Sequence, residues 1–137
     1  MVTPNIPEAE VLTGMQIDNG PSVERAARQI YDLGAKNVII KGGHASGEES
    51  IDILFDGAGF HEFSAPRINT KNTHGTGCTL SSALATYLSQ RKNIYNSCKM
   101  SLRYVDEAIT YAPGYGKGFG PLNHLISFNL FLAPSIV

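Results

Sequence analysis

The clearest hydrophobic pattern in the chain has the period of an amphipathic helix. It recurs in residues 21–34, 76–90 and 94–112. In the second of these stretches, the apolar positions are spaced i, i+3, i+4, i+7 and i+8: Leu80, Ala83, Leu84, Tyr87 and Leu88. This spacing puts them on one face, so each stretch is predicted to be a helix packed on a core. A shorter helix is predicted over residues 6–13, with a proline near its start and a glycine after its end.

Runs rich in β-branched and aromatic residues predict the strands. Residues 37–41, NVIIK, form a short apolar run without alternation, which suits a strand buried on both faces of a parallel sheet. Residues 51–55 and 59–64 flank Asp56-Gly57, a strong hairpin signal. The order helix, helix, strand, hairpin, helix, helix predicts an α/β layer, in which loops at the carboxyl ends of strands gather on one side.

A glycine-rich segment, NTHGTGC, leads into the helix predicted to begin near Thr76 or Gly77. The first backbone N–H groups of a helix have no intrahelical acceptor, and the helix dipole leaves partial positive charge there. Because Gly75 and Gly77 would let an anion approach the bare backbone, this segment is a candidate anion cradle. The alternative is an ordinary start capped by Asn72 or Thr73, with the glycines serving a tight turn.

Composition and charge narrow the class of protein. A chain of 137 residues with 42% apolar residues suits one globular domain, and no repeat or low-complexity linker marks an interior boundary. The net charge of −1, with acids and bases interspersed, argues against nucleic-acid and membrane-surface partners. No stretch approaches the length of an apolar membrane span. The two cysteines, Cys78 and Cys98, provide no disulfide framework, so we expect a cytoplasmic protein.

Several residues in the predicted loops suit phosphate chemistry. Asn5 and Glu8 could hold water around Mg²⁺, which prefers oxygen ligands. Lys41 could neutralise a transferring phosphoryl group, and Cys78, in the first turn of a helix, could accept a proton. Each also has a plainer interpretation. Asn5 and Glu8 suit helix capping, Lys41 suits a solvated strand end, and Cys78 suits a small buried side chain.

Four segments, taken together, carry a resemblance to a known family. They are TPNIPEAEVLTG at 3–14, VIIKGGH at 38–44, NTHGTGCTLSSALA at 72–85 and AITYAPGYGKGFGPLNH at 108–124. In order and spacing, the chain resembles the bacterial hydroxymethylpyrimidine and phosphomethylpyrimidine kinases of thiamine synthesis, from Val2 to about His124. These enzymes belong to the ribokinase-like superfamily.

The resemblance implies part of a larger fold. It implies an α/β, ribokinase-like three-layer sandwich, of which residues 1–137 form a single partial domain, the C-terminal half with a truncated central sheet. The tail, residues 125–137, lies outside the match, and its apolar part would pack on a core or a neighbour. Strands left without neighbours favour pairing with another chain. We therefore expect a homo-oligomer or a complementing N-terminal chain.

The resemblance also implies roles for individual residues. Cys78 would be the catalytic base, at a position where the wider superfamily usually has aspartate, and Gly75, Thr76 and Gly77 would complete an anion hole. Asn5 and Glu8 would order phosphate and Mg²⁺ through water. The implied contacts to ATP are Lys41, Gly42 and Thr73, and the loop from Gly114 to Gly120 would lie by the nucleotide.

The implied reaction is ATP-dependent phosphorylation of the hydroxymethyl or phosphomethyl group of 4-amino-2-methylpyrimidine. This half is expected to have little or no activity alone. Three alternatives stay open: a pyridoxal kinase of the same branch, a non-catalytic nucleotide-binding or interaction fragment, and a cysteine hydrolase using Cys78 and His74. His44 and His124 are expected to be structural, and His61 a solvated residue of an edge strand.

Overall fold

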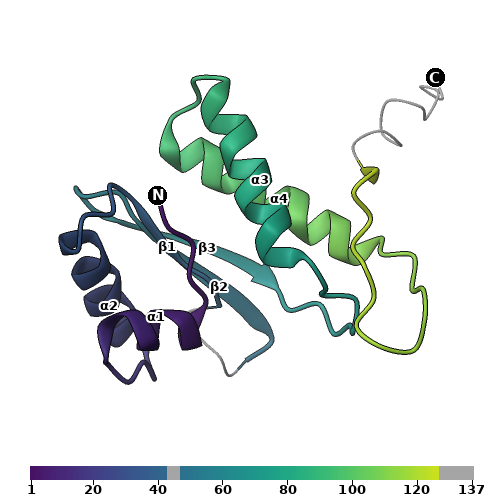
Figure 1. Cartoon of the computed structure of the whole chain (residues 1–137), viewed down its shortest axis with the longest axis horizontal. Helices are drawn as coiled ribbons and strands as arrows, with labels where there is room; N and C mark the ends of the chain where they lie inside the picture. Colours follow the sequence, from purple (N-terminus) through teal and green to yellow (C-terminus); the bar gives the residue numbers. More distant parts are fainter. Residues whose placement is uncertain (43–46, 127–137) are drawn as a thin grey trace. The chain divides into compact units, whose positions relative to one another are not determined.

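The computed structural model describes residues 1–42 and 47–126, which fold into two compact units (Figure 1). Unit 1, Met1–Arg67, contains α1 (Ile6–Thr13), α2 (Gly20–Asp32), β1 (Val38–Ile40), β2 (Glu49–Phe55) and β3 (Phe60–Pro66). Unit 2, Ile68–Val137, contains α3 (Thr76–Ser89) and α4 (Ile94–Thr110). The predicted order of elements is confirmed. His44 and the tail segment 127–137 lie outside the described residues.

The sheet of unit 1 differs from the parallel sheet that the sequence predicts. Its three strands have the order β1-β2-β3, and both pairings are antiparallel. The reason is the length of the connections, because a parallel pairing needs a crossover of a dozen or more residues and the segment between β1 and β2 is too short for one. Beside β1, isolated parallel bridges join Val2 to Val38 and Asn5 to Lys41.

The core of unit 1 lies between the two helices and one face of the sheet (Figure 1). The amphipathic stretch predicted over residues 21–34 contains α2, and four of its apolar residues are buried: Val23, Ala26, Ala27 and Ile30. They pack in one cluster with Ala9 of α1 and with residues of β1 and β2. All three residues of β1 are buried, as expected for a strand without a solvated face.

The hairpin of β2 and β3 turns at Asp56, as predicted, and its polar groups are paired. The Asp56 carboxylate accepts hydrogen bonds from the Ala58 and Gly59 N–H groups, each at 2.8 Å. His61 Nε2 lies 2.9 Å from the same carboxylate. His61 lies on the edge strand β3 and its side chain is 36% exposed, which agrees with the predicted solvated edge residue. The turn adds a partner that the sequence analysis did not predict, because it brings Asp56 within hydrogen-bonding distance of the His61 ring.

Unit 2 is built on two packed helices and the loop that follows them. Leu80 and Leu84 of α3 are buried, as are Cys98 and Val105 of α4. After α4 the chain returns toward the start of α3, where the backbone N–H of His74 donates to the Gly120 carbonyl at 3.2 Å. In the described part of the chain, no helix is both long and apolar enough to cross a membrane.

Candidate functional site

The start of α3 is the first part of the candidate site. Its N-cap is Gly75, which has a φ of 87°, and no side chain caps the helix. The alternative of a cap by Asn72 or Thr73 is therefore wrong, because the chain enters the helix through a left-handed glycine that most side chains disfavour. The turn is fixed by other bonds, since the Thr76 hydroxyl donates to the Thr73 carbonyl at 2.7 Å. The Thr76 N–H donates to the Thr73 carbonyl at 3.3 Å, and no side chain caps the N–H groups of the first turn. The partial positive charge at this helix start would favour an anion.

The two cysteines of the chain have opposite environments. Cys78, in the first turn of α3, is exposed, whereas Cys98 of α4 is fully buried. Burial raises the pKa of the Cys98 thiol to about 12, so this thiol is protonated at neutral pH. Cys78 is therefore the cysteine that can exchange a proton with a bound molecule, and the interpretation of Cys78 as a small buried side chain is wrong.

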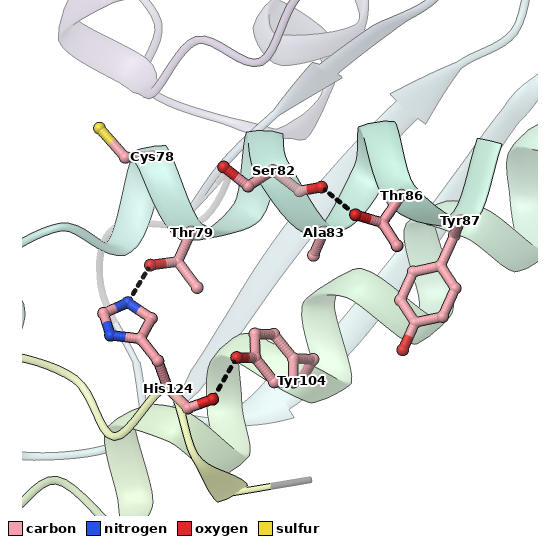
Figure 2. Close-up of a pocket in the computed structure, with 8 residues that line it drawn as sticks. All are labelled: Cys78, Thr79, Ser82, Ala83, Thr86, Tyr87, Tyr104 and His124. Atoms are coloured by element: carbon pink, nitrogen blue, oxygen red, sulfur yellow. Dashed lines mark hydrogen bonds between the residues drawn. The ribbon is translucent and has the colours of Figure 1, made fainter. Parts of the chain in front are cut away.

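A cavity of about 420 Å³ opens beside Cys78 in unit 2 (Figure 2). Hydroxyl groups and two tyrosine rings line it, together with one histidine, and its lining residues are Cys78, Thr79, Ser82, Ala83, Thr86, Tyr87, Tyr104 and His124. The volume falls in the range of small-molecule sites. A small ligand in this cavity would lie against the exposed thiol and close to the uncapped start of α3.

A hydrogen-bond network ties the start of α3 to the loop after α4 (Figure 2). The Thr79 hydroxyl donates to the Gly75 carbonyl at 2.8 Å and lies 3.0 Å from His124 Nε2. Since a hydroxyl has one hydrogen, His124 Nε2 acts as the donor to Thr79. The Tyr104 hydroxyl donates to the His124 carbonyl at 2.9 Å. His124 thus has a structural role, as expected, because it hydrogen-bonds Thr79, the residue whose hydroxyl donates to the N-cap Gly75.

The glycine-rich loop of residues 113–124 also approaches the NTHGTGC segment. A Cβ atom at Gly120 would overlap the side-chain oxygen of Asn72, so a larger residue at this close approach would force the Asn72 side chain to move. His74 contributes its backbone to the contact, through the hydrogen bond to Gly120 and a bridge to Pro121. The loop and the NTHGTGC segment, which are distant in sequence, therefore form one surface of unit 2.

In unit 1, Asn5 and Glu8 form a complete capping box at the start of α1. The Asn5 side chain accepts the Glu8 N–H at 2.8 Å, and the Glu8 carboxylate accepts the Asn5 N–H at 2.8 Å. The capping interpretation of this pair is thus confirmed. The box uses one carboxylate oxygen of Glu8, an exposed residue, and leaves the other oxygen for water or for a hydrated cation.

Lys41 lies next to this capping box in space. Its backbone N–H donates to the Pro4 carbonyl at 2.9 Å, and a parallel bridge joins it to Asn5. The structure therefore brings together Asn5, Glu8 and Lys41, which lie in two distant segments of the sequence. A convergence of these residues with the start of α3, in unit 2, stays a prediction.

Asp52 is a residue of this region that the sequence analysis missed. Its carboxylate accepts the Gly42 N–H at 2.6 Å, and it thereby holds the backbone directly after Lys41. Burial raises the pKa of Asp52 above its ordinary value, while the Gly42 hydrogen bond and the Lys41 charge act in the opposite direction. The signal in the sequence was an aspartate inside the otherwise apolar run IDILF, which calls for a specific partner.

Each of the two units offers oxygen and nitrogen groups that suit phosphate. Within residues 1–42 and 47–126, no group of three or more histidine, cysteine, aspartate or glutamate side chains could hold a metal ion. The pair of Asn5 and Glu8 suits a cation held through water, because Mg²⁺ keeps several waters and accepts oxygen ligands.

Comparison with known protein sequences agrees with the resemblance that the four sequence segments carry. The sequence profile of the phosphomethylpyrimidine kinase family matches residues 1–123. The thiamine biosynthesis bifunctional protein ThiED of Geobacter sulfurreducens is 53% identical over 127 residues, 93% of this chain and 26% of that protein. The hydroxymethylpyrimidine/phosphomethylpyrimidine kinase of Bacillus subtilis is 45% identical over 124 residues, 90% of this chain and 46% of that kinase. The chain thus spans less than half the length of these curated relatives.

Comparison with solved structures supports the predicted fold over the matched part. The pyridoxal kinase of Staphylococcus aureus in complex with AMP-PCP matches with a TM-score of 0.84 and 33% identity. The match covers 90% of this chain and 46% of that one. The two units together therefore correspond to part of a ribokinase-like kinase fold, with the small antiparallel sheet described above.

Proposed function

Because this chain belongs to the phosphomethylpyrimidine kinase family, we propose that it supplies catalytic and nucleotide-binding groups for a phosphoryl transfer. The donor is ATP, and the acceptor is the hydroxymethyl or phosphomethyl group of a 4-amino-2-methylpyrimidine. Since the chain spans 46% of the Bacillus subtilis kinase, the proposal includes a requirement for the rest of the kinase fold. The chain alone is expected to have little or no activity.

The observation that carries this proposal is the uncapped start of α3 with an exposed cysteine in its first turn. Phosphoryl transfer depends mainly on positioning and on stabilising charge at the phosphate oxygens. The N–H groups around Gly75, Thr76 and Gly77 would receive that charge. The exposed Cys78 side chain lies in the same first turn of the helix.

In the proposed reaction, Cys78 is the general base. Its thiolate accepts the proton of the substrate hydroxyl, so that an S–H bond forms as the O–H bond breaks. The freed oxygen pair attacks the γ-phosphorus of ATP, and the bond from that phosphorus to the β–γ bridging oxygen breaks. ADP leaves with the electron pair of that bond. A phosphomethyl substrate would attack in the same way through an oxygen of its phosphate group.

The groups of unit 1 would bind the nucleotide phosphates. The Lys41 ammonium would contact them, and Asp52 would hold the adjoining Gly42 in place through its hydrogen bond. Thr73, which belongs to unit 2, is proposed as a further nucleotide contact. Asn5 and Glu8 would hold Mg²⁺ through water, and the bound cation would neutralise part of the phosphate charge.

The test uses a chimera of the Bacillus subtilis kinase in which this chain replaces the 124 residues that it matches. Activity is measured with the pyrimidine substrate and ATP. Cys78→Ala should lower kcat by about 10²- to 10⁴-fold, the usual contribution of a general base. Cys78→Asp should restore much of the loss, because a carboxylate can accept the same proton. Full activity in Cys78→Ala would remove the proposed base.

A pyridoxal kinase is the second candidate, because the pyridoxal kinase of Staphylococcus aureus matches the fold closely. The same chimera separates the two by kcat/KM for pyridoxal and for the pyrimidine. A non-catalytic fragment is the third, motivated by the partial coverage of the relatives. It predicts ATP binding in the chimera without turnover of either substrate.

A further inference from the structure

The cavity beside Cys78 suits an uncharged part of a ligand (Figure 2). None of the described residues that line it is an aspartate, glutamate, lysine or arginine. The rings of Tyr87 and Tyr104 and the side chain of Ala83 supply apolar surface, which suits a flat ring. The phosphate of a ligand would therefore lie at the start of α3, and an uncharged ring would lie in the cavity.

Two hydroxyl groups in the cavity wall give their hydrogen to a backbone carbonyl. Thr86 donates to the Ser82 carbonyl at 2.9 Å, and Tyr104 donates to the His124 carbonyl at 2.9 Å. Figure 2 shows both bonds within the cavity wall. A hydroxyl has one hydrogen and two lone pairs, so each of these groups offers only lone pairs to a ligand. The Thr86 and Tyr104 oxygens are therefore hydrogen-bond acceptors in the cavity.

The other hydroxyls of the wall do not reverse this polarity. The Thr79 hydroxyl donates to the Gly75 carbonyl at 2.8 Å and receives the hydrogen of His124 Nε2, so its bonds lie within unit 2. The hydroxyls of Ser82 and Tyr87 can rotate to donate or to accept. A ligand group that donates can use all of the rotatable and committed oxygens, whereas a group that accepts competes with the internal bonds for hydrogen. The wall therefore favours a donor.

We infer that this cavity selects a ring with an exocyclic amino group over the same ring with an oxo group, and that the Thr86 and Tyr104 oxygens accept the amino hydrogens. An amino group conjugated with a ring donates, whereas an oxo oxygen accepts. The inference rests on the proposed phosphoryl transfer, in which both the adenine of ATP and the 4-aminopyrimidine carry such a group. It goes further than that proposal because it names the residues that set the selectivity. Pyridoxal, the substrate of the second candidate function, has no exocyclic amino group.

The test compares ligands that differ only at this group. Their dissociation constants for the Bacillus subtilis chimera are measured by isothermal titration calorimetry, without turnover. One arm compares ADP with inosine diphosphate, which has an oxo group in place of the amino group of ADP. The other arm compares 4-amino-5-hydroxymethyl-2-methylpyrimidine with its 4-oxo analogue. The arm whose preference depends on the cavity residues identifies the ring that the cavity receives.

In at least one arm, the amino ligand should bind about tenfold more tightly than its oxo analogue, as expected for one or two hydrogen bonds. Thr86→Val removes an acceptor and keeps a β-branched side chain, so this ratio should fall to about threefold or less. Tyr104→Phe should lower the ratio in the same direction. Thr110→Val is the matched control and should leave the ratio unchanged. Thr110 also donates to a carbonyl one turn away, that of Asp106 at 2.7 Å, but it does not line the cavity.

Equal binding of the amino and oxo ligands in both arms would overturn the inference. A preference that persists in both Thr86→Val and Tyr104→Phe would overturn it too, as would a chimera that binds neither amino ligand. Because binding is measured without phosphoryl transfer, the two proposals can fail separately. A chimera without kinase activity that keeps the residue-dependent preference contradicts the proposed function alone, and an active chimera without that preference contradicts this inference alone.

Discussion

The start of α1 and the start of α3 solve the same physical problem in opposite ways. Every helix begins with N–H groups that lack intrahelical acceptors. At α1, Asn5 and Glu8 satisfy two of them reciprocally within the chain. Asparagines cap α2 and α4 in a similar way, through Asn19 and Asn93. Among the described helices, α3 is the exception, since its N-cap is a glycine without a capping side chain.

The difference shows where the chain leaves donors for another molecule. A capped start is worth about 1 kcal/mol to helix stability, so the glycine at α3 forgoes stability that three other helices obtain from asparagine. The other features of unit 2 keep the uncapped turn in one geometry, through Thr79, His124 and the contact of Gly120 with Asn72. A fixed, uncapped helix start is the arrangement that favours anion binding.

The largest expected effect comes from placing a negative charge at the uncapped start. Gly77→Asp puts a carboxylate in the first turn of α3, where it stabilises the helix dipole but repels nucleotide phosphates. In the chimera, kcat/KM for ATP should fall by about 100-fold or more, without a decrease in the thermal midpoint. Asn96→Asp, in the first turn of the capped helix α4, is the matched control and should leave both quantities unchanged. Normal ATP kinetics in Gly77→Asp would contradict an anion site at α3.

A smaller effect separates the capping role of the Asn5–Glu8 pair from its proposed cation role. Glu8→Gln keeps an oxygen that can accept the Asn5 N–H, since glutamine also completes a capping box, but removes the charge. We expect an unchanged thermal midpoint and an increase of about tenfold in the Mg²⁺ concentration for half-maximal activity, typical of a group that acts on a metal through its ligands.

The control for this pair is Asn5→Ala, which removes the cap. It should lower the free energy of unfolding by about 1 kcal/mol, measured by denaturant titration of the isolated chain. If Glu8→Gln lowers stability as much as Asn5→Ala does and leaves the Mg²⁺ dependence unchanged, the pair serves only to cap α1.

The sequence predicted the helices and strands well because the relevant signals are local. The apolar stripe of α2 and the turn at Asp56 both act within a few residues of the chain, and the structure has them as predicted. The direction of strand pairing was not predictable from the composition of NVIIK alone. That direction depends on the connection between β1 and β2, which is too short for a crossover.

The chemical groups of the candidate site could be predicted from the sequence, but the residues that hold these groups in place could not. The glycine segment and Cys78 carry a local pattern, and the structure places them at an uncapped helix start and an exposed position. The partners that hold these groups are distant in sequence. Thr79 meets His124 across 45 residues, and Asp52 meets Gly42 across 10. Such pairs follow from tertiary packing, which periodicity and motif spacing do not encode.

The smallest expected effect concerns the Asp56 turn, which satisfies backbone N–H groups with a carboxylate as the start of α1 does. Hydrogen bonds from His61, Gly59 and Ala58 lower the pKa of Asp56 from 3.8 to about 2. Because the folded state favours the ionised form, this stabilisation is present above pH 4 and is lost as the pH falls from about 4 toward 2. Asp56→Asn should therefore be less stable than the wild type at pH 5, with the difference shrinking toward pH 2, as measured by urea unfolding followed by circular dichroism.

Glu62→Gln, an exposed position on β3 of the same hairpin, is the control for a general loss of negative charge. A difference between Asp56→Asn and the wild type that is constant over this pH range would mean that the turn depends on the shape of the side chain and not on its ionisation.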